Sequence, residues 1–174
     1  MAKPLTNEDI LKLETLFTSV FSYLDTLRAV TPLALTIQYP KIPSVLSESL
    51  IIRLHSMLFK GSIDAEFGKP ESDVRLSYPG GEFKHVEVKA TGESAFEFFG
   101  KRDLAADYLI WIHFGRYFHG KKDSIAIYCL PSPSEYFQSE TKITLKDFLK
   151  RVNGSKLTKM EGQSISALLG RTLE

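Results

Sequence analysis

The segment 71–91 constrains the fold of this 174-residue chain more than any other stretch. Two runs, 73–78 and 82–90, alternate apolar with polar residues, and Pro79-Gly80-Gly81 separates them. Alternation is typical of a strand with one buried face, and a Pro-Gly-Gly sequence between two such runs is typical of a tight turn. We therefore expect an antiparallel hairpin, and a sheet must form part of the fold.

The hairpin carries charged residues that point the same way. Glu87 and Lys89 are two residues apart in the second strand, so their side chains project from one face. Val86 and Val88 point toward a core instead, and Asp73 opens the first strand. Two carboxylates and an ammonium that converge would suit a divalent cation with a cationic helper, as in metal-assisted hydrolysis of a phosphodiester. The alternative is a solvated strand face with a cross-strand ion pair.

The rest of the chain mixes helical and strand-like patterns. Thr6 and Asp9 have the spacing of a helix start, and apolar residues at helical intervals follow them. Residues 31–43 hold three prolines and are expected to be irregular. No repeat or linker divides the chain, so we expect one α/β domain over residues 1–174, with a mixed sheet flanked by helices. The expected helices are 6–28, 44 or 47 to 60, 94–106, 144–152 and 159–169, and the other expected strands are 62–67, 108–114 and 124–130.

The charged positions of the hairpin resemble the PD-(D/E)xK nuclease motif. Ser72-Asp73-Val74 is followed, fourteen residues after the aspartate, by Glu87-Val88-Lys89. The segment 107–112 also resembles the strand after the crossover helix of that superfamily, and the similarity covers about residues 44–130, the expected catalytic core. Ser72 stands where the motif has proline, a residue without a chemical role. The resemblance implies a restriction-endonuclease-like fold.

The resemblance also implies a role for each matching residue. Asp73 and Glu87 would be Mg²⁺ ligands, because hard oxygen ligands suit that ion. Lys89 would orient or deprotonate the attacking water and stabilise charge on the phosphate. Many members place a helix glutamate near the metal, and Glu48 in the second expected helix is the candidate here. The alternative for Glu48 is a surface residue favoured in the first helical turn.

By the same resemblance, the chain is expected to act as a small type II restriction endonuclease. Such an enzyme is a homodimer that cuts both strands of double-stranded DNA at a short specific sequence, with one site in each subunit. The helices outside the core would then build the interface and the sequence-reading surface. Two alternatives remain open: a Holliday-junction resolvase or repair nuclease of the same superfamily, and a catalytically inactive DNA-binding protein on this scaffold.

Overall charge does not indicate nucleic-acid binding. Lys and Arg number 22 and Asp and Glu 21, so any basic surface must come from local clustering. The segment 116–122, RYFHGKK, mixes cations with aromatic residues and is a candidate for contacts with phosphates or bases. Asp64 and Glu66 alternate with apolar residues and are expected to face solvent. Core or subunit-interface positions are expected for three clustered residues: Phe96, Phe98 and Phe99.

Cysteine and histidine usage excludes some classes of protein. The single cysteine, Cys129, rules out an internal disulfide and fits a reducing cytoplasm, and its apolar surroundings predict a buried thiol. The four histidines lack the spacing of a zinc site. No signal peptide is evident, and no apolar run approaches the ~20 residues of a membrane span, so we expect a cytoplasmic protein without a membrane partner.

Overall fold

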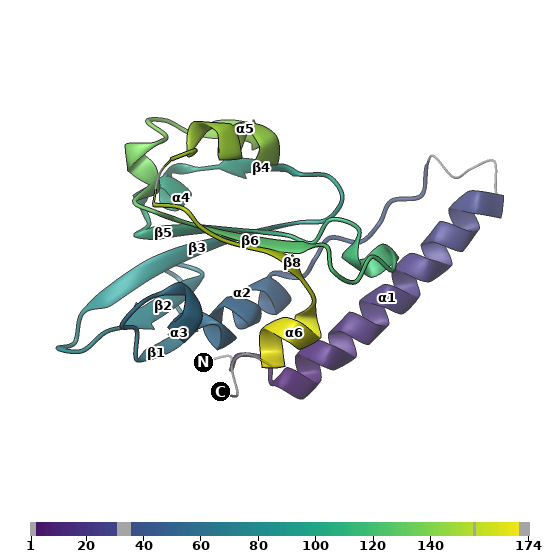
Figure 1. The fold of residues 1–174 in the computed structure, drawn as a ribbon, viewed down its shortest axis with the longest axis horizontal. Helices are drawn as coiled ribbons and strands as arrows, with labels where there is room; N and C mark the ends of the chain where they lie inside the picture. Colours follow the sequence, from purple (N-terminus) through teal and green to yellow (C-terminus); the bar gives the residue numbers. More distant parts are fainter. Residues whose placement is uncertain (1–2, 31–35, 155, 171–174) are drawn as a thin grey trace.

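A mixed β-sheet forms the centre of the molecule (Figure 1). The computed structural model describes residues 3–30, 36–154 and 156–170. Within them, the sheet contains, in spatial order, β1 (Asp64–Phe67), β2 (Val74–Ser77), β3 (Phe83–Thr91), β5 (Tyr108–His113), β6 (Ile125–Pro131) and β8 (Thr158–Gln163). β3 and β5 run parallel, whereas the other neighbouring strands are antiparallel.

Further elements cover both faces of this sheet (Figure 1). One face carries α1 (Asn7–Val30), α2 (Ser44–Arg53), α3 (His55–Leu58) and α6 (Ile165–Gly170). The other carries α4 (Lys101–Ala105), α5 (Leu145–Arg151) and a small antiparallel sheet of β4 (Phe96–Phe99) and β7 (Thr141–Thr144). Two short 3-10 helices, η2 (Tyr117–His119) and η3 (Pro133–Glu135), lie in loops.

Each face of the central sheet has its own apolar layer. Val86 and Ile110 are fully buried in the layer beneath α1 and α2, whereas Leu109 and Trp111 are fully buried in the layer beneath α5. Neighbouring residues of one strand enter opposite layers because successive side chains alternate across a sheet. The predicted α/β architecture, with a mixed sheet and helices on both faces, is confirmed.

The hairpin of β2 and β3 forms where the sequence predicts it. Val74 pairs with Val86, and Ser77 pairs with Phe83. The turn residues Gly80 and Gly81 have φ angles of 86° and 83°, in the left-handed region that favours glycine. The hairpin therefore has the register that the alternation of its residues implies.

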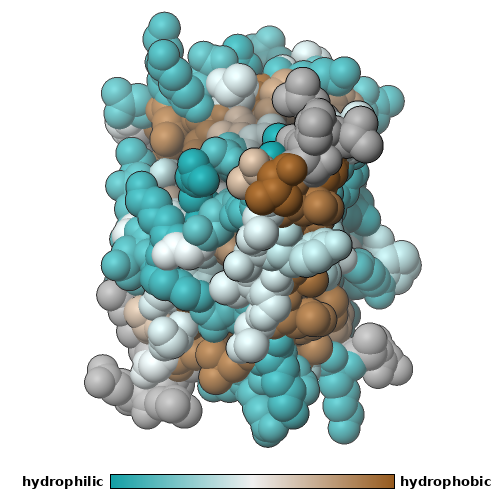
Figure 2. Space-filling model, turned by 90° about the vertical axis from the view of Figure 1, so that its right-hand side faces the viewer, coloured by the Kyte–Doolittle hydropathy of each residue, from teal (hydrophilic) through white to brown (hydrophobic). Residues whose placement is uncertain are grey.

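The first helix also begins as predicted. The Thr6 hydroxyl oxygen accepts the backbone N–H of Asp9 at 3.1 Å, and the Asp9 carboxylate accepts the backbone N–H of Thr6 at 3.1 Å. α1 exposes several apolar side chains, including Leu16 and Tyr23. Figure 2 shows apolar surface on this side of the molecule as patches interrupted by hydrophilic residues. No helix in the described ranges is long and apolar enough to cross a bilayer.

The helix predicted over 94–106 is wrong in its first half. Residues 96–99 form β4, which pairs with β7, and only 101–105 are helical. Gly100 is the residue before the helix, and its N–H donates to the Asp103 carboxylate at 2.7 Å. Phe99 is buried as expected, whereas Phe96 and Phe98 are 49% and 46% exposed. Alternation across β4 therefore overrides the helix-like spacing of its phenylalanines.

The helix predicted over 159–169 is wrong as well. Residues 158–163 form β8 at the edge of the sheet, and helical structure begins only at Ile165. β8 covers the backbone of β6, which would otherwise be an unpaired edge. The predicted irregular segment 31–43 lies partly outside the described residues, and residues 37–43 have no regular secondary structure.

Candidate active site

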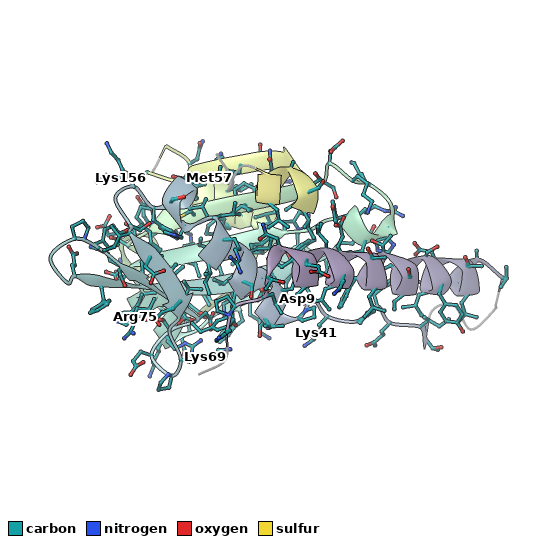
Figure 3. All side chains as sticks on the ribbon, turned by 90° about the horizontal axis from the view of Figure 1, so that it is seen from below. Asp9, Lys41, Met57, Lys69, Arg75 and Lys156 are labelled. Carbon is teal, nitrogen blue, oxygen red and sulfur yellow. The ribbon has the colours of Figure 1, made fainter. Side chains whose placement is uncertain are left out.

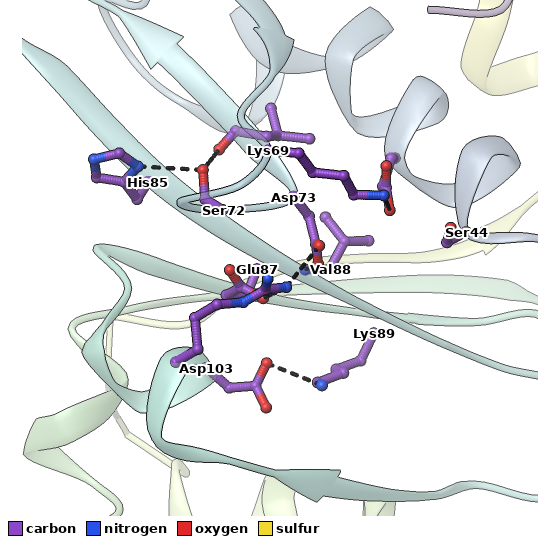
Figure 4. A network of polar contacts seen from close by, with 12 residues as sticks. Ser44, Lys69, Ser72, Asp73, His85, Glu87, Val88, Lys89 and Asp103 are labelled. Carbon is purple, nitrogen blue, oxygen red and sulfur yellow. Dashed lines mark hydrogen bonds and ion pairs between the residues drawn. The ribbon is translucent and has the colours of Figure 1, made fainter. Parts of the chain in front are cut away.

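The β2–β3 hairpin brings two carboxylates to one point (Figure 4). The register places Asp73, the residue before β2, opposite Glu87. The Asp73 Oδ1 and Glu87 Oε2 atoms lie 2.9 Å and 2.7 Å from the same nitrogen, Nη2 of Arg102. The backbone N–H of Val88 donates to Asp73 Oδ2 at 3.0 Å and holds this carboxylate toward β3. The structure thus brings Asp73 and Glu87 together, as the hairpin pattern implies.

Glu87 is buried at a position where a negative charge is unfavourable. Its side chain is 1% exposed, and its Oε1 atom has no hydrogen-bond partner among the described residues. Burial raises the pKa of Glu87 to about 7; the hydrogen bond from Arg102 opposes this rise, and the negative charge of Asp73 adds to it. An ionised buried carboxylate that lacks part of its partners is unfavourable, which favours either a proton on Glu87 or a further positively charged ligand at this point.

The two carboxylates fit a hard divalent cation. Mg²⁺ is typically held by one or two carboxylates, and waters and phosphate oxygens complete its coordination. Asp73 and Glu87 would supply the carboxylates, and Glu87 Oε1 is free to accept a ligand bond. No group of three Asp, Glu, His or Cys side chains in the part of the chain that the structure describes is arranged to hold a metal.

Lys89 projects from β3 on the same face as Glu87 but has a separate partner. Its ammonium lies 2.9 Å from Oδ1 of Asp103 in α4 (Figure 4). Asp103 is nearly buried and also accepts the N–H of Gly100, so this carboxylate is fixed by the helix start. Lys89 is 24% exposed and is therefore held beside the two carboxylates of the hairpin with access to solvent.

Glu48 is buried in α2 and does not bond directly to the hairpin carboxylates. Its Oε1 atom accepts a hydrogen bond from the ammonium of Lys69 at 3.2 Å, and its side chain is 4% exposed. α2 covers the face of the sheet opposite α4 (Figure 1). Glu48 is thus a buried ion-pair partner rather than a surface residue, and its role near a metal stays a prediction. Of the residues expected to face solvent, Asp64 is exposed, whereas Glu66 is half-buried and binds Arg75.

Sequence reasoning missed two residues of the site, Arg102 and Asp103. Both lie in α4, and the longer helix predicted over 94–106 gave no reason to direct them toward the hairpin. The signal that would have placed them is the Gly100-x-x-Asp103 spacing, since an acidic residue at the third helical position commonly bonds back to the residue before the helix. A helix that starts at Lys101 presents Arg102 and Asp103 in its first turn.

Ser72, which stands where the motif has proline, has a local structural role. It is fully buried, and its hydroxyl donates to the carbonyl of Val74 at 3.0 Å. The same hydroxyl lies 3.2 Å from Nδ1 of His85, which lines a hollow of about 200 Å³ together with Glu87. A Cβ atom at Gly68 would lie only 2.1 Å from the Ser72 hydroxyl. Ser72 therefore fixes the turn that leads into Asp73.

The RYFHGKK segment places its aromatic rings in the core. Tyr117 and Phe118 are buried against α1, and the ring of His119 bonds to Asp25 through Nδ1. These rings are therefore not available to stack on bases. The cations at 116, 121 and 122 remain on the surface, and phosphate contacts through them stay a prediction.

Exposed lysines line two cavities, neither of which has Asp73 or Glu87 in its lining. Figure 3 places Lys69 and Lys41 along one border of the molecule. Lys69 also lines a cavity of about 560 Å³ beside Glu48. Lys41 and Glu97 line a second cavity, of about 470 Å³, that begins at the end of β3. Glutamates line both cavities as well, and Lys69 is paired with Glu48, so neither cavity has an excess of positive charge.

No family model, curated protein or solved structure matches the chain.

Proposed function

We propose that the protein is a Mg²⁺-dependent endonuclease that hydrolyses phosphodiester bonds of double-stranded DNA at a short specific sequence, as type II restriction enzymes do. The observation that carries this proposal is the convergence of Asp73 and Glu87 on one nitrogen of Arg102, with Glu87 Oε1 buried and unpartnered in the described structure. Lys89 supplies the cationic helper on the same face of β3. An ion pair with Arg102 alone would leave the buried Oε1 atom of Glu87 without a hydrogen-bond partner.

Each residue has a definite task in the proposed reaction. Bound Mg²⁺ would supply an activated water and neutralise charge on the phosphate. Asp73 and Glu87 would hold the ion, since they provide the hard oxygen atoms. Lys89, whose ammonium is held by Asp103, would orient the attacking water and stabilise the negative charge that develops on the phosphate. Exposed Lys41 and Lys69 would attract the DNA backbone.

The chain topology supports the resemblance to PD-(D/E)xK nucleases. The hairpin follows helices α2 and α3, and β5 lies parallel to β3 after a connection that contains α4. A strand that returns parallel after a helix agrees with the crossover expected from residues 107–112. A restriction-endonuclease-like fold and a homodimer, with one site for each DNA strand, belong to this proposal.

A cleavage assay tests the proposal. The protein is incubated with phage DNA in Mg²⁺ or in EDTA, and the products are separated on a gel. We expect discrete fragments in Mg²⁺ and none in EDTA, and we expect Asp73→Ala and Glu87→Ala to abolish cutting. Asp64→Ala, which removes an exposed carboxylate from β1, is the matched control and should cut normally.

Other outcomes identify the alternatives. Cutting confined to four-way junctions would indicate a resolvase, and a smear would indicate a repair nuclease. Binding of DNA without cutting in any divalent cation would indicate an inactive scaffold. Normal cutting by either alanine variant would refute the site assignment.

A further inference from the structure

Arg102 holds together the two carboxylates that we assign to the metal. A single nitrogen, Nη2, donates to Asp73 at 2.9 Å and to Glu87 at 2.7 Å. The other guanidinium nitrogens of Arg102 make no hydrogen bond to any described residue. Arg102 therefore bridges the two carboxylates through one nitrogen, and its other N–H donors have no partner among the described residues.

The exposure of the three side chains differs sharply. The Asp73 and Glu87 side chains are 12% and 1% exposed, whereas that of Arg102 is 53% exposed. The carboxylates are fixed by the sheet, but Arg102 extends from the five-residue helix α4 and can turn into water. Of the three partners, only the arginine can leave the site without unfolding the hairpin.

The guanidinium and a metal ion would compete for the space between the two carboxylates. Nη2 of Arg102 already lies between Asp73 Oδ1 and Glu87 Oε2, so a cation that both carboxylates bind would meet the positive charge of the guanidinium there. Without any cation, the two adjacent buried carboxylates would repel each other when both are ionised. While both carboxylates are ionised, the site thus needs a positive charge, and it does not accommodate two in the same place.

We propose that Arg102 is the resident counter-ion of the metal site and that the divalent cation displaces it. The inference rests on the proposed function, because it assigns the cation to Asp73 and Glu87. In the metal-free protein, Arg102 keeps the carboxylates in place. When the cation binds, the guanidinium moves into solvent, and the energy of its two hydrogen bonds is subtracted from the metal affinity. Arg102 thus keeps the site preformed without metal, and it lowers the affinity of the site for the metal.

Metal binding to the intact protein without DNA tests this inference. Mg²⁺ and Mn²⁺ are titrated calorimetrically into the wild type, Arg102→Gln and Lys101→Gln. Lys101→Gln removes the same charge from the neighbouring exposed position of α4 and controls for the general loss of positive charge. We expect Arg102→Gln to bind the metal about tenfold more tightly than Lys101→Gln, because the metal no longer has to displace a charged partner, and a half-exposed arginine contributes only modestly.

Thermal unfolding gives a second measurement. Arg102→Gln should unfold at a lower temperature than the wild type in EDTA and should gain more from added Mg²⁺. If this variant folds only when Mg²⁺ is present, that result also supports displacement. Arg102→Lys, which keeps one charge, should fall between the wild type and the glutamine variant in metal affinity.

Two results would overturn the inference in different ways. Equal or weaker metal binding by Arg102→Gln relative to Lys101→Gln would refute displacement while the metal site itself stands. Absence of metal binding in all three proteins would refute the metal site, and the proposed function would fall with it.

Discussion

Replacing Glu87 with glutamine should stabilise the metal-free protein, and the gain should depend on pH. Burial raises the pKa of Glu87 from the usual 4.5 to about 7. A folded-state pKa above the unfolded-state value means that the folded protein binds this proton more tightly. The stability that the proton contributes is complete below pH 4.5 and is lost as the pH rises through 7. Glutamine carries no titrating proton, so the variant avoids this loss.

The size of the stability difference follows from the pKa shift of Glu87. Folding and proton binding are linked. Because the folded-state pKa exceeds the unfolded-state pKa, the unfolding free energy of the wild type falls by about 2 kcal/mol between pH 5.5 and pH 8. Relative to the wild type, Glu87→Gln should therefore gain about 2 kcal/mol over this interval. For a chain of this length the gain corresponds to a relative increase of about 4–8 °C in melting temperature. The lost bond from Arg102 adds a constant offset that does not change with pH.

Urea unfolding in EDTA at both pH values measures the difference. Glu135→Gln, an exposed glutamate in η3, is the control and should show no pH-dependent gain. Added Mg²⁺ should stabilise the wild type at pH 8 but not Glu87→Gln, so the metal should reduce or reverse the advantage of the variant. A difference between wild type and variant that stays constant from pH 5.5 to pH 8 would refute the reasoning, because it would mean that Arg102 fully balances the Glu87 charge.

Three further predictions concern single groups. Lys89→Ala should bind cognate duplex DNA in a gel shift but lose turnover by about 10²–10⁴-fold, and cleavage at a near-normal rate would make Lys89 a structural partner of Asp103. Alanine at position 116, 121 or 122 should reduce the salt dependence of DNA binding by about one unit of slope for each phosphate that the cation no longer neutralises, and three unchanged slopes would leave these cations as plain surface. Burial raises the pKa of the Cys129 thiol to about 12, so it should react with a thiol reagent only after denaturation, and rapid labelling of the folded protein would contradict its burial.

The parts of the fold that sequence patterns predict well are those with a local cause. β5 and β6 are continuous apolar runs, and each is almost wholly buried. The hairpin has its turn residues between two alternating runs, and its register alone is enough to place Asp73 opposite Glu87. Periodicity and turn chemistry act over a few residues, so they can be read from one chain.

The parts that the sequence predicts poorly depend on distant partners. β8 is mostly exposed and has no apolar alternation, since its pairing with β6 satisfies backbone groups rather than side chains. Likewise, β4 exists because β7, more than forty residues later, pairs with it. Arg102 joins the site only because β4 ends at Phe99 and α4 turns back over the hairpin. No pattern within a short window contains these pairings.

The close approach of Gly68 to Ser72 extends the sensitivity of the site beyond its charged residues. A methyl group at position 68 would meet the Ser72 hydroxyl at 2.1 Å and backbone atoms of Val74 and Arg75 at 3.1 Å. Either the Ser72 hydroxyl would turn away from Val74 and His85 or the loop that leads into Asp73 would shift, although alanine is small, uncharged and several residues away from any proposed ligand. Natural variants or engineered libraries that change position 68 should therefore resemble active-site mutants, and a survey restricted to acidic and basic residues would overlook them.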